Sequence, residues 1–495
     1  MRKFLAKVFA TYIYFKNRKW IYNPIEYQKK TFKKLINKAS DTKFGIEHNF
    51  NKIKSYKDYK DKVPVRDYEQ IKPYIDIILA GEDNVLWPGK PVYLSKTSGT
   101  TSGVKYIPIS NESMPTHIIS ARDAILRYIY YSGNTSFING KQIFLQGSPV
   151  LQKKNNISIG RLSGIVAHYV PSYLQKNRLP SWETNCTEDW DKKVDLIVEE
   201  TINQKMTLIG GIPPWVQMYF EKIIQKRGDK IGEVFKYFSL FIYGGVNFEP
   251  YKNVFKKLIG REIDTIELFP ASEGFFAYQD KPSKEDLLLL LNNGIFYEFI
   301  EASKFYDSDR ERLSLGEVEV GVVYVMIISS NAGLWAYNVG DTVKFTSILP
   351  FRILVTGRLK HFISAFGEHV IGIEVERAMK KVLKNSFIEI VEFSVAPQVS
   401  PPRGLPYHEW FIEFRTFPKD MEEFSKSLDL SIQDQNSYYR DLIEGKILRT
   451  LQITVIEKKG FQDYMKSIGK LGGQNKVPRL SNDRKLADNL IKFSI

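Results

Sequence analysis

The residues best suited to chemistry form a polar stretch, Lys96–Lys105, which follows the strand-like segment Pro91–Ser95. It reads Lys-Thr-Ser-Gly-Thr-Thr-Ser-Gly-Val-Lys. Its glycines let the backbone aim several N–H groups at one point, and its hydroxyls and lysines add donors and positive charge. Such a loop can hold the phosphates of a nucleotide. It is not a Walker A loop, because Gly-x-x-x-x-Gly-Lys is absent. A flexible surface loop of small polar residues is the alternative interpretation.

Three shorter motifs follow later strand-like segments. The pair Gly244–Gly245 removes side chains where a flat ring could lie against the backbone. Ser272–Glu273 places a carboxylate in a loop, where it could bind a metal that bridges phosphates. Gly340–Asp341 places an acid after a glycine turn, where it could accept hydrogen bonds from ribose hydroxyls. Taken singly, each motif is explained equally well by an ordinary turn or a solvated acid.

Taken together and in this order, the four motifs resemble the adenylate-forming superfamily of enzymes. The resemblance is strongest to its Gretchen Hagen branch, the auxin-responsive promoter family of acyl acid amido synthetases, on its bacterial side. It extends from about residue 24 to the end of the sequence. Three further strings are typical of this branch: Val63–Tyr68, Leu86–Pro91 and Asn475–Arg479.

The resemblance implies a ligase that works in two half-reactions. A carboxylate attacks the α-phosphate of ATP to give an acyl-adenylate and pyrophosphate, and the amine of an amino acid or another amine then takes the acyl group and releases AMP. Because AMP leaves far more readily than oxide, the protein has mainly to position reactants and neutralise charge. A covalent nucleophile is not required, which agrees with the absence of Gly-x-Ser-x-Gly.

The resemblance also assigns roles to residues at matching positions. The hydroxyl–glycine loop would wrap the phosphates, the glycine pair would lie beside adenine, the Ser-Glu pair would bind nucleotide and magnesium, and Asp341 would hold the ribose. The nucleotide-binding residues expected on this basis are Ser98, Gly99, Thr100, Thr101, Gly103, Gly244, Gly245, Ser272, Asp341 and Arg358, the last at an expected hinge.

Three residues are expected to act directly in the reaction. Lys105 adds charge beside the phosphates, Glu273 binds the metal, and Lys476 meets the α-phosphate while the adenylate forms. The sequence departs from the family pattern at three other positions: Phe269 stands near a frequent tyrosine, Asn338 near a frequent arginine of the plant motif, and His369 near a frequent lysine. The role of His369 therefore stays open.

The secondary structure expected from the sequence is of the α/β class. Residues 1–80 are typical of helices, and strands and helices alternate from about residue 90. The strand candidates are Gln142–Gly147, Thr207–Gly211, Phe238–Gly245 and Thr265–Phe269, with a helix at Tyr251–Ile259 before the last. This alternation predicts a parallel sheet. Residues 295–347, including Glu317–Val325, predict a β-rich subdomain.

A domain boundary is expected near Gly357, where a strand-like segment ends and two charged residues follow. The prediction is a large N-terminal ATP- and acid-binding domain, 1–357, and a smaller, mobile α+β domain, 358–495. The strand candidates of the smaller domain are Ile390–Val395, Trp410–Arg415 and Gln452–Val455. The resemblance implies that this domain rotates between the half-reactions.

Net charge, apolar runs and cysteine content limit the possible classes of protein. The formal net charge is +15, but the basic residues are dispersed, and no nucleic-acid-binding motif stands out. No apolar run approaches the roughly 20 residues of a membrane-crossing helix. Cys186 is the only cysteine, which excludes intrachain disulfides and favours a reducing cytoplasm. The basic N-terminal segment, with Tyr14 and Trp20, either lies on a membrane surface or packs on its own domain.

Two rival functions stay open. One is an acid–thiol ligase that passes the acyl group to coenzyme A, and the other is a non-catalytic nucleotide-binding or membrane-surface protein. The acid and the amine are not identified by the sequence, nor is the oligomeric state. Arg122 and Arg127 could hold a carboxylate or be solvated. His168 could be a base for the amine or a hydrogen-bonded core residue.

Overall fold

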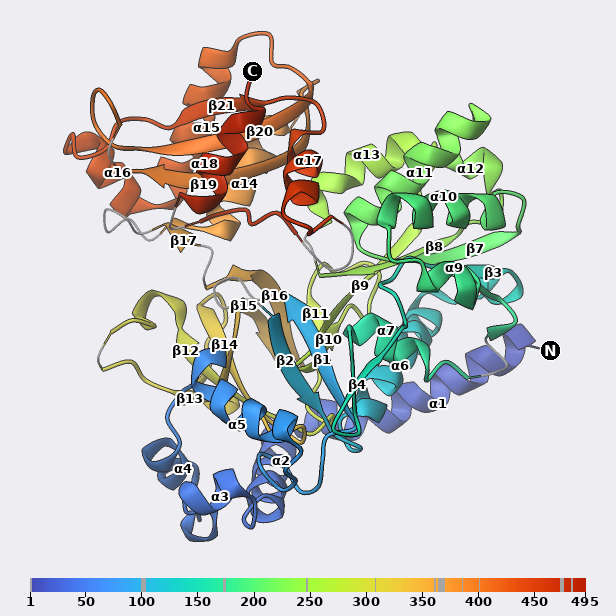
Figure 1. The fold of residues 1–495 in the computed structure, drawn as a ribbon, viewed down its shortest axis with the longest axis vertical. Helices are drawn as coiled ribbons and strands as arrows, with labels where there is room; N and C mark the ends of the chain where they lie inside the picture. Colours follow the sequence, from blue (N-terminus) through green and yellow to red (C-terminus); the bar gives the residue numbers. More distant parts are fainter. Residues whose placement is uncertain are drawn as a thin grey trace.

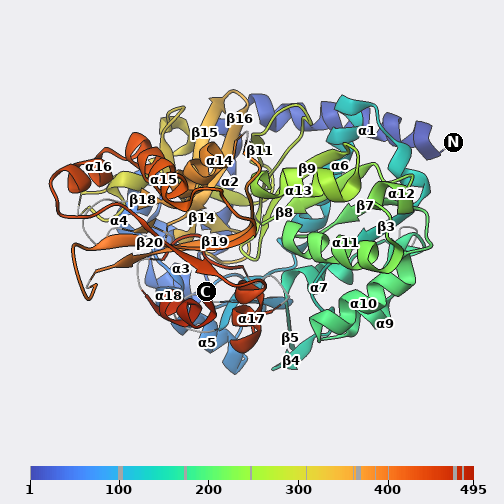
Figure 2. The ribbon, with the colours of Figure 1, turned by 90° about the horizontal axis from the view of Figure 1, so that it is seen from above.

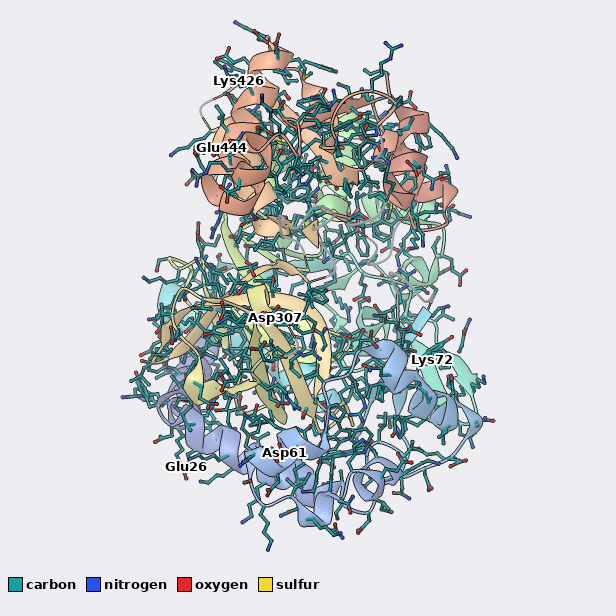
Figure 3. All side chains as sticks on the ribbon, turned by 90° about the vertical axis from the view of Figure 1, so that its left-hand side faces the viewer. Glu26, Asp61, Lys72, Asp307, Lys426 and Glu444 are labelled. Carbon is teal, nitrogen blue, oxygen red and sulfur yellow. The ribbon has the colours of Figure 1, made fainter. Side chains whose placement is uncertain are left out.

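The computed structural model describes residues 2–98, 104–171, 175–245, 248–307, 309–359, 362–363, 370–384, 386–399, 401–471, 476–481 and 484–495. Figure 1 shows a large body with a smaller unit, in orange and red, above it. Exposed charged residues of both signs are spread over both parts, including Glu26, Asp61, Lys72, Asp307, Lys426 and Glu444 (Figure 3). None of the helices in the described ranges has the length and apolar character needed to cross a membrane.

One half of a large mixed sheet is parallel. Its strands lie in the order β9–β8–β7–β3–β6, and each pairs in parallel with its neighbour. The bounds are β3 (Lys141–Phe144), β6 (Arg178–Leu179), β7 (Met206–Gly210), β8 (Leu240–Gly244) and β9 (Asp264–Ala271). Every residue of β7 is buried, as expected for a strand covered on both faces. The sheet therefore needs a helical layer on each side.

The two helical layers come from different parts of the chain. One face packs against α10 (Trp190–Thr201), α11 (Pro213–Arg227), α12 (Ile231–Val234) and α13 (Glu249–Ile259). The other face packs against α1 (Arg2–Tyr22) and α6 (Met114–Ser132), with the turn η2 (Ser136–Asn139). Pro213 and Pro214 begin α11, where a proline costs no helical hydrogen bond. The predicted strand–helix alternation is confirmed.

The other half of the same sheet is antiparallel. It continues from β9 through β10 (Gly274–Tyr278), β11 (Leu287–Leu289), β16 (Phe351–Arg358), β15 (Tyr337–Ile348), β14 (Val323–Ser330), β12 (Ile295–Glu301) and β13 (Leu313–Ser314). Its large core includes residues of α2 (Pro24–Lys38), α3 (Lys43–Glu47), α4 (Tyr56–Lys62) and α5 (Tyr68–Ala80), and of the turn η1 (Phe50–Lys52). The helical N-terminal segment and the β-rich region are thus both confirmed.

A second, four-stranded sheet carries the hydroxyl–glycine motif. Its order is β2–β1–β5–β4, with β1 (Tyr93–Ser98), β2 (Val104–Ile109), β4 (Gln152–Lys154) and β5 (Ile157–Gly160). The short helices α7 (Leu162–Ala167) and α9 (Trp182–Cys186) follow it in the chain.

One strand prediction is wrong. Residues Glu317–Val322 do not form a strand: the turn η4 (Leu315–Glu317) comes first, and β14 begins only at Val323. Gly321 has φ +93°, a left-handed conformation that interrupts an extended chain. The alternation of valine and charged residues here imitates the two-residue period of a strand, but a glycine turn breaks it.

The smaller C-terminal unit is an α+β layer structure. Its sheet is β19 (Glu389–Gln398), β20 (Tyr407–Thr416) and β21 (Gln452–Ile456), with β20 and β21 parallel. One face packs against α14 (Gly372–Leu383), α15 (Met421–Gln435) and α16 (Ser437–Glu444). The other packs against α17 (Gly460–Ser467), α18 (Lys485–Leu490) and η5 (Ile491–Phe493). The predicted strand candidates all lie within these strands.

The chain passes from one hydrophobic core to another shortly after β16. Leu359, just after β16, belongs to the large N-terminal core, whereas Val370 belongs to the C-terminal core. The change of core therefore falls a few residues after Gly357. The short pair β17 (Phe362–Ile363) and β18 (Val370–Ile371) lies in this connection.

A buried ion network fixes α6 against the sheet. Asp280, which is fully buried, accepts from Arg127 Nη2 of α6 at 2.8 Å and from Arg352 Nη2 of β16 at 2.6 Å. Arg352 Nη1 also donates to Asp286 Oδ1 at 2.9 Å. Arg127 is thus engaged inside the fold, which disfavours the idea that it binds a substrate carboxylate.

Glu267 differs from Asp280, because no arginine pairs with its carboxylate among the described contacts. It lies on β9 opposite Tyr243 of β8, whose hydroxyl donates to Glu267 Oε2 over 3.5 Å. Burial raises the pKa of Glu267 to about 7, and the positive charge of Lys252 offsets this only in part. The folded chain therefore holds this proton more tightly than the unfolded chain does.

Asp280→Ala should destabilise the protein strongly. It leaves the buried guanidinium of Arg127 without its carboxylate and removes one of the two carboxylates that Arg352 contacts. Breaking a buried pair in this way typically costs about 3–5 kcal/mol. The exposed pair of Asp76 and Lys72 provides the control, because Asp76→Ala should cost less than about 1 kcal/mol. Thermal unfolding followed by circular dichroism measures both variants. Equal shifts in Tm would contradict the structural role of Asp280.

Glu267→Gln should change how stability depends on pH. The stability linked to the raised pKa of Glu267 is fully present below the unfolded value of 4.5 and is lost as the pH rises through about 7. Glutamine carries no charge, so the Tm of the variant relative to wild type should be higher at pH 8 than at pH 5. Glu262→Gln is the control, because Lys256 lowers the pKa of that exposed acid. A difference that does not grow with pH would disprove the assignment.

Candidate functional site

The two ends of the hydroxyl–glycine motif lie on paired strands of a β-hairpin. Strands β1 and β2 pair in antiparallel register, with Ser98 opposite Val104 and Thr97 opposite Lys105. Gly99, Thr100, Thr101 and Gly103 lie outside the described residues, and so do the contacts of the Ser98 side chain. Lys105 Nζ lies 5.4 Å from the ring centroid of Tyr68. The hairpin thus holds both ends of the motif side by side, as a loop around phosphates requires.

The Ser-Glu motif is a tight turn fastened to this hairpin. Ser272 and Glu273 connect β9 to β10, and Ala271 and Gly274 pair across the turn. The hydroxyl oxygens of Ser272 and Ser95 lie 2.9 Å apart, in hydrogen-bond contact and buried. Ser95 belongs to β1, so the turn and the base of the hairpin are joined directly. Two motifs far apart in sequence therefore meet.

The glycine pair lies at the end of β8, and a different steric constraint favours glycine at each of the two positions. A β-carbon at Gly244 would collide with the carbonyl oxygen of Leu268 on the neighbouring strand β9. The close approach of β9 therefore requires glycine here. Gly245 has φ +79°, and a β-carbon there would lie 3.1 Å from Lys476 Nζ. Gly245 thus leaves space that the side chain of Lys476 approaches.

This contact brings the C-terminal unit onto the N-terminal body at a predicted nucleotide motif. Lys476 was expected to act beside the phosphates, and its amine stands next to the pair expected beside adenine. The side chain of Lys476 is exposed.

The Gly-Asp motif lies on β15, with Asp341 directly opposite Arg358 of β16. Gly340 has φ +85°; its N–H donates to the Asn338 side chain at 2.9 Å, and its carbonyl accepts from Leu359 N–H at 2.7 Å. Asn338 therefore shapes this turn. The side chain of Arg358 lies outside the described residues, as does His369. Strand β11 separates β16 from β10, so this motif is on the same sheet as the Ser-Glu turn but not on a neighbouring strand.

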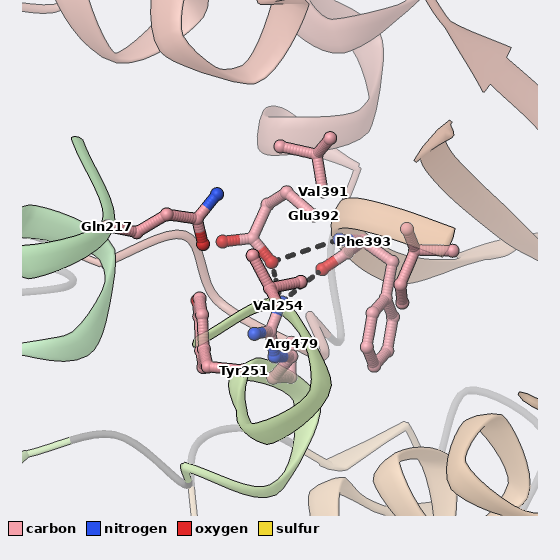
Figure 4. A pocket seen from close by; sticks show the side chains of 8 residues that line it. Gln217, Tyr251, Val254, Val391, Glu392, Phe393 and Arg479 are labelled. Atoms are coloured by element: carbon pink, nitrogen blue, oxygen red, sulfur yellow. Dashed lines mark hydrogen bonds and ion pairs between the residues drawn. The ribbon is translucent and has the colours of Figure 1, made fainter. Parts of the chain in front are cut away.

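The two parts of the molecule meet in a contact that includes a small pocket (Figure 4). Gln217, Tyr251 and Val254 line it from α11 and α13, and Glu392 and Arg479 line it from the C-terminal unit. Arg479 donates through Nη1 to the carbonyl of Phe393 at 3.0 Å and forms an ion pair with Glu392. Arg479 follows Lys476 closely in sequence, so this contact helps to fix the segment that carries the lysine.

Two ion pairs join the same elements across the contact. Arg415 Nη2 of β20 lies 2.7 Å from Glu221 Oε1 of α11, and Lys257 of α13 pairs with Glu389 of β19. The C-terminal unit is therefore docked on α11 and α13. Figure 1 shows it above the ends of β9, β15 and β16.

A group of basic residues near the end of β3 was not found from the sequence. Lys193, almost fully buried, donates to the carbonyls of Gln146 at 3.0 Å and Asn185 at 2.6 Å. Arg178 Nη2 donates to Gln146 Oε1 at 2.6 Å. Burial lowers the pKa of Lys193 to about 8 and that of Arg178 to about 10. A lysine within a helix gives no sequence signal of such burial.

Two other candidate residues have structural partners. Arg122 donates through Nη2 to Asp123 Oδ1 at 2.7 Å. His168 Nε2 lies 2.9 Å from the carbonyl oxygen of Pro149, to which it donates, and its ring meets Trp182 edge-on at 4.9 Å between centroids. His168 is exposed and is not the core residue that the alternative interpretation suggested.

The chain was compared with known protein families and with proteins of known function. Sequence models of the GH3 family match residues 17–142 (N-terminal domain), 288–358 (central domain) and 373–485 (C-terminal domain), more than half of the chain. Jasmonoyl--L-amino acid synthetase GH3.5 of Oryza sativa subsp. japonica is 22% identical, with 92% of each chain covered. Indole-3-acetic acid-amido synthetase GH3.3 of Arabidopsis thaliana is 20% identical, with 91% of this chain and 88% of the relative covered.

Solved structures show the same fold. The GH3.15 acyl acid amido synthetase superposes with a TM-score of 0.80 at 16% identity, covering 97% of this chain and 95% of the other. A 2-hydroxyisobutyryl-CoA ligase, solved in its postadenylation state, gives a TM-score of 0.56 at 11% identity, covering 95% and 90%. The fold is therefore that of adenylate-forming ligases. With the three domain matches and the full-length relatives, these findings establish that the chain belongs to the GH3 family, the Gretchen Hagen family that its motifs resemble.

Proposed function

We propose that this protein is an ATP-dependent acyl acid amido synthetase. It activates a carboxylic acid as an acyl-adenylate and transfers the acyl group to the amine of an amino acid or another small amine. Membership of the GH3 family supports the reaction class, and the curated relatives are named as amido synthetases. The observation that carries the proposal is the placement of Lys476 Nζ beside Gly245, because it joins a C-terminal cation to the nucleotide motifs.

Each half of the proposed site has a defined task. The β1–β2 hairpin positions the phosphate loop, with Lys105 adding positive charge near its base. Asp341 accepts hydrogen bonds from the ribose. Lys476 brings its ammonium group to the α-phosphate, where negative charge grows as the acid attacks. Once pyrophosphate has left, undocking of the C-terminal unit withdraws Lys476 and admits the amine.

Magnesium is part of this proposal. In the described ranges, no three His, Cys, Asp or Glu side chains are grouped as ligands for an ion. Nucleotide enzymes usually hold Mg²⁺ through one or two carboxylates, with the phosphates supplying further oxygens. Glu273, in the turn beside Ser272, fits that ligand set as a single carboxylate. The ion would neutralise phosphate charge there.

A cytoplasmic location completes the proposal. The reaction consumes ATP, and the only cysteine, Cys186, is free.

The test of the function measures both half-reactions. Exchange of labelled pyrophosphate into ATP, with a panel of carboxylic acids including jasmonic and indole-3-acetic acids, reports adenylate formation. The accepted acid is then supplied with amino acids, hydroxylamine or coenzyme A. We expect an amide with an amino acid and no thioester. Thioester without amide would establish the coenzyme A ligase instead, the second candidate that the fold of the 2-hydroxyisobutyryl-CoA ligase favours.

Lys476→Ala should separate catalysis from binding. Its contact acts mainly in the reacting state, so pyrophosphate exchange should fall at least about 100-fold while the Kd for ATP changes less than about threefold. Lys470→Ala, which removes an exposed lysine from the same segment, should leave both unchanged. Similar losses in exchange and in ATP binding would remove Lys476 from the role proposed here.

A further inference from the structure

Helix α1 is firmly attached to the body through one of its faces. Ala10, Ile13 and Trp20 are buried, and Ala10 and Ile13 share a core cluster with residues of α6. Asn17 Nδ2 donates to Asp123 Oδ2 of α6 at 3.3 Å, and the rings of Tyr14 and Tyr130 stack at 3.9 Å. The position of α1, along the outer edge of the molecule in Figures 1 and 2, is therefore set by packing.

A second face of α1 is apolar and exposed. Its six large side chains are between 42% and 69% exposed: Phe4, Leu5, Val8, Phe9, Tyr12 and Phe15. At about 100° per residue they fall within an arc of about 140° on the helix. We call these six residues the α1 apolar face. A contiguous exposed group of this kind marks an interaction surface, whereas single exposed apolar residues do not.

The charge of α1 indicates what kind of partner covers this face. The helix has no acidic residue and six basic ones: Arg2, Lys3, Lys7, Lys16, Arg18 and Lys19. Cations also stack on its rings, since Arg18 lies 5.8 Å from the Phe15 centroid and Arg122 of α6 lies 5.7 Å from that of Phe9. Aromatic and aliphatic side chains with surrounding cations are typical of helices that lie at an anionic lipid interface.

The α1 apolar face lies before the part of the chain that the family model matches. The match to the GH3 N-terminal domain begins at residue 17, after all six members of the α1 apolar face. The family match therefore gives no reason for these residues to be both apolar and exposed.

We propose that the α1 apolar face docks this protein on an anionic lipid bilayer. The helix lies in the plane of the membrane surface, with its six side chains among the acyl chains near the headgroups and its lysines and arginines at the phosphates. The packed face keeps α1 attached to α6, so the whole ligase is held at the surface. Binding combines apolar burial with charge attraction and therefore weakens as salt screens the charges.

Vesicle sedimentation of the full chain tests the proposal. Vesicles of phosphatidylcholine alone are compared with vesicles containing about 30% phosphatidylglycerol. We expect at least tenfold stronger binding to the anionic vesicles at low salt, and a marked loss in 0.5 M NaCl. No binding to anionic vesicles, or equal binding to both kinds, would overturn the proposal.

Two matched pairs of variants locate the surface. The triple change Phe4→Gln, Val8→Gln, Tyr12→Gln should weaken vesicle binding at least tenfold. Its control replaces three apolar residues elsewhere that are at least 60% exposed: Ile46→Gln, Tyr237→Gln, Phe387→Gln. Likewise, Lys7→Gln, Lys16→Gln, Lys19→Gln should weaken binding, whereas the exposed set Lys57→Gln, Lys419→Gln, Lys426→Gln, with the same net charge, should not.

Further measurements distinguish a loss of vesicle binding from a loss of folding. None of them depends on the enzymatic activity. An unchanged Tm shows that the apolar-face variant is folded, and the lysine variants test the surface without touching apolar packing. Light scattering examines the other possible occupant: a wild-type dimer that becomes monomeric in the apolar-face variant would assign the face to a second copy and overturn the proposal. Equal vesicle binding by a variant and its control would also overturn it.

Discussion

The organisation of the site depends on one contact between the two parts of the molecule, the approach of Lys476 to Gly245. Gly245 has φ +79°, a conformation that favours glycine, and without a β-carbon it leaves room for the end of the Lys476 side chain. The neighbouring Gly244 is glycine for another reason, the carbonyl of Leu268 on β9. Two neighbouring positions thus require glycine for different reasons: the close approach of β9 at Gly244, and the left-handed backbone beside Lys476 at Gly245.

The sheets position the remaining motifs relative to this contact. Ser95 and Ser272 link the hairpin of the second sheet to the β9–β10 turn of the first, while β8 and β9 run side by side up to the glycine pair. Asp280, held by arginines of α6 and β16, keeps the helical layer against the same region. The glycine pair and the Ser-Glu turn lie at strand ends of this scaffold, whereas the Gly-Asp motif lies within β15.

Much of this could be predicted from the sequence, because fold class and family follow from local patterns. Glycine and proline signals gave the ends of β7, β8 and α11, and the order of four motifs identified the family. The predicted strand at Glu317–Val325 was wrong in its first part, Glu317–Val322, because alternating residues resemble a strand even across a glycine turn. The contacts of Ser95 with Ser272 and of Lys476 with Gly245 join distant segments, and no local pattern reveals them. The buried state of Lys193 and Asp280 is equally a tertiary property.

The docking of the C-terminal unit has a consequence for turnover. Its pairs, Arg415 with Glu221 and Lys257 with Glu389, are partly open to water, and such pairs contribute only about 0–1 kcal/mol each. The pocket beside Tyr251 also leaves the contact incompletely packed. These ion pairs therefore add little to the adhesion between the two surfaces, and they would resist only weakly the undocking that the proposed reaction cycle includes.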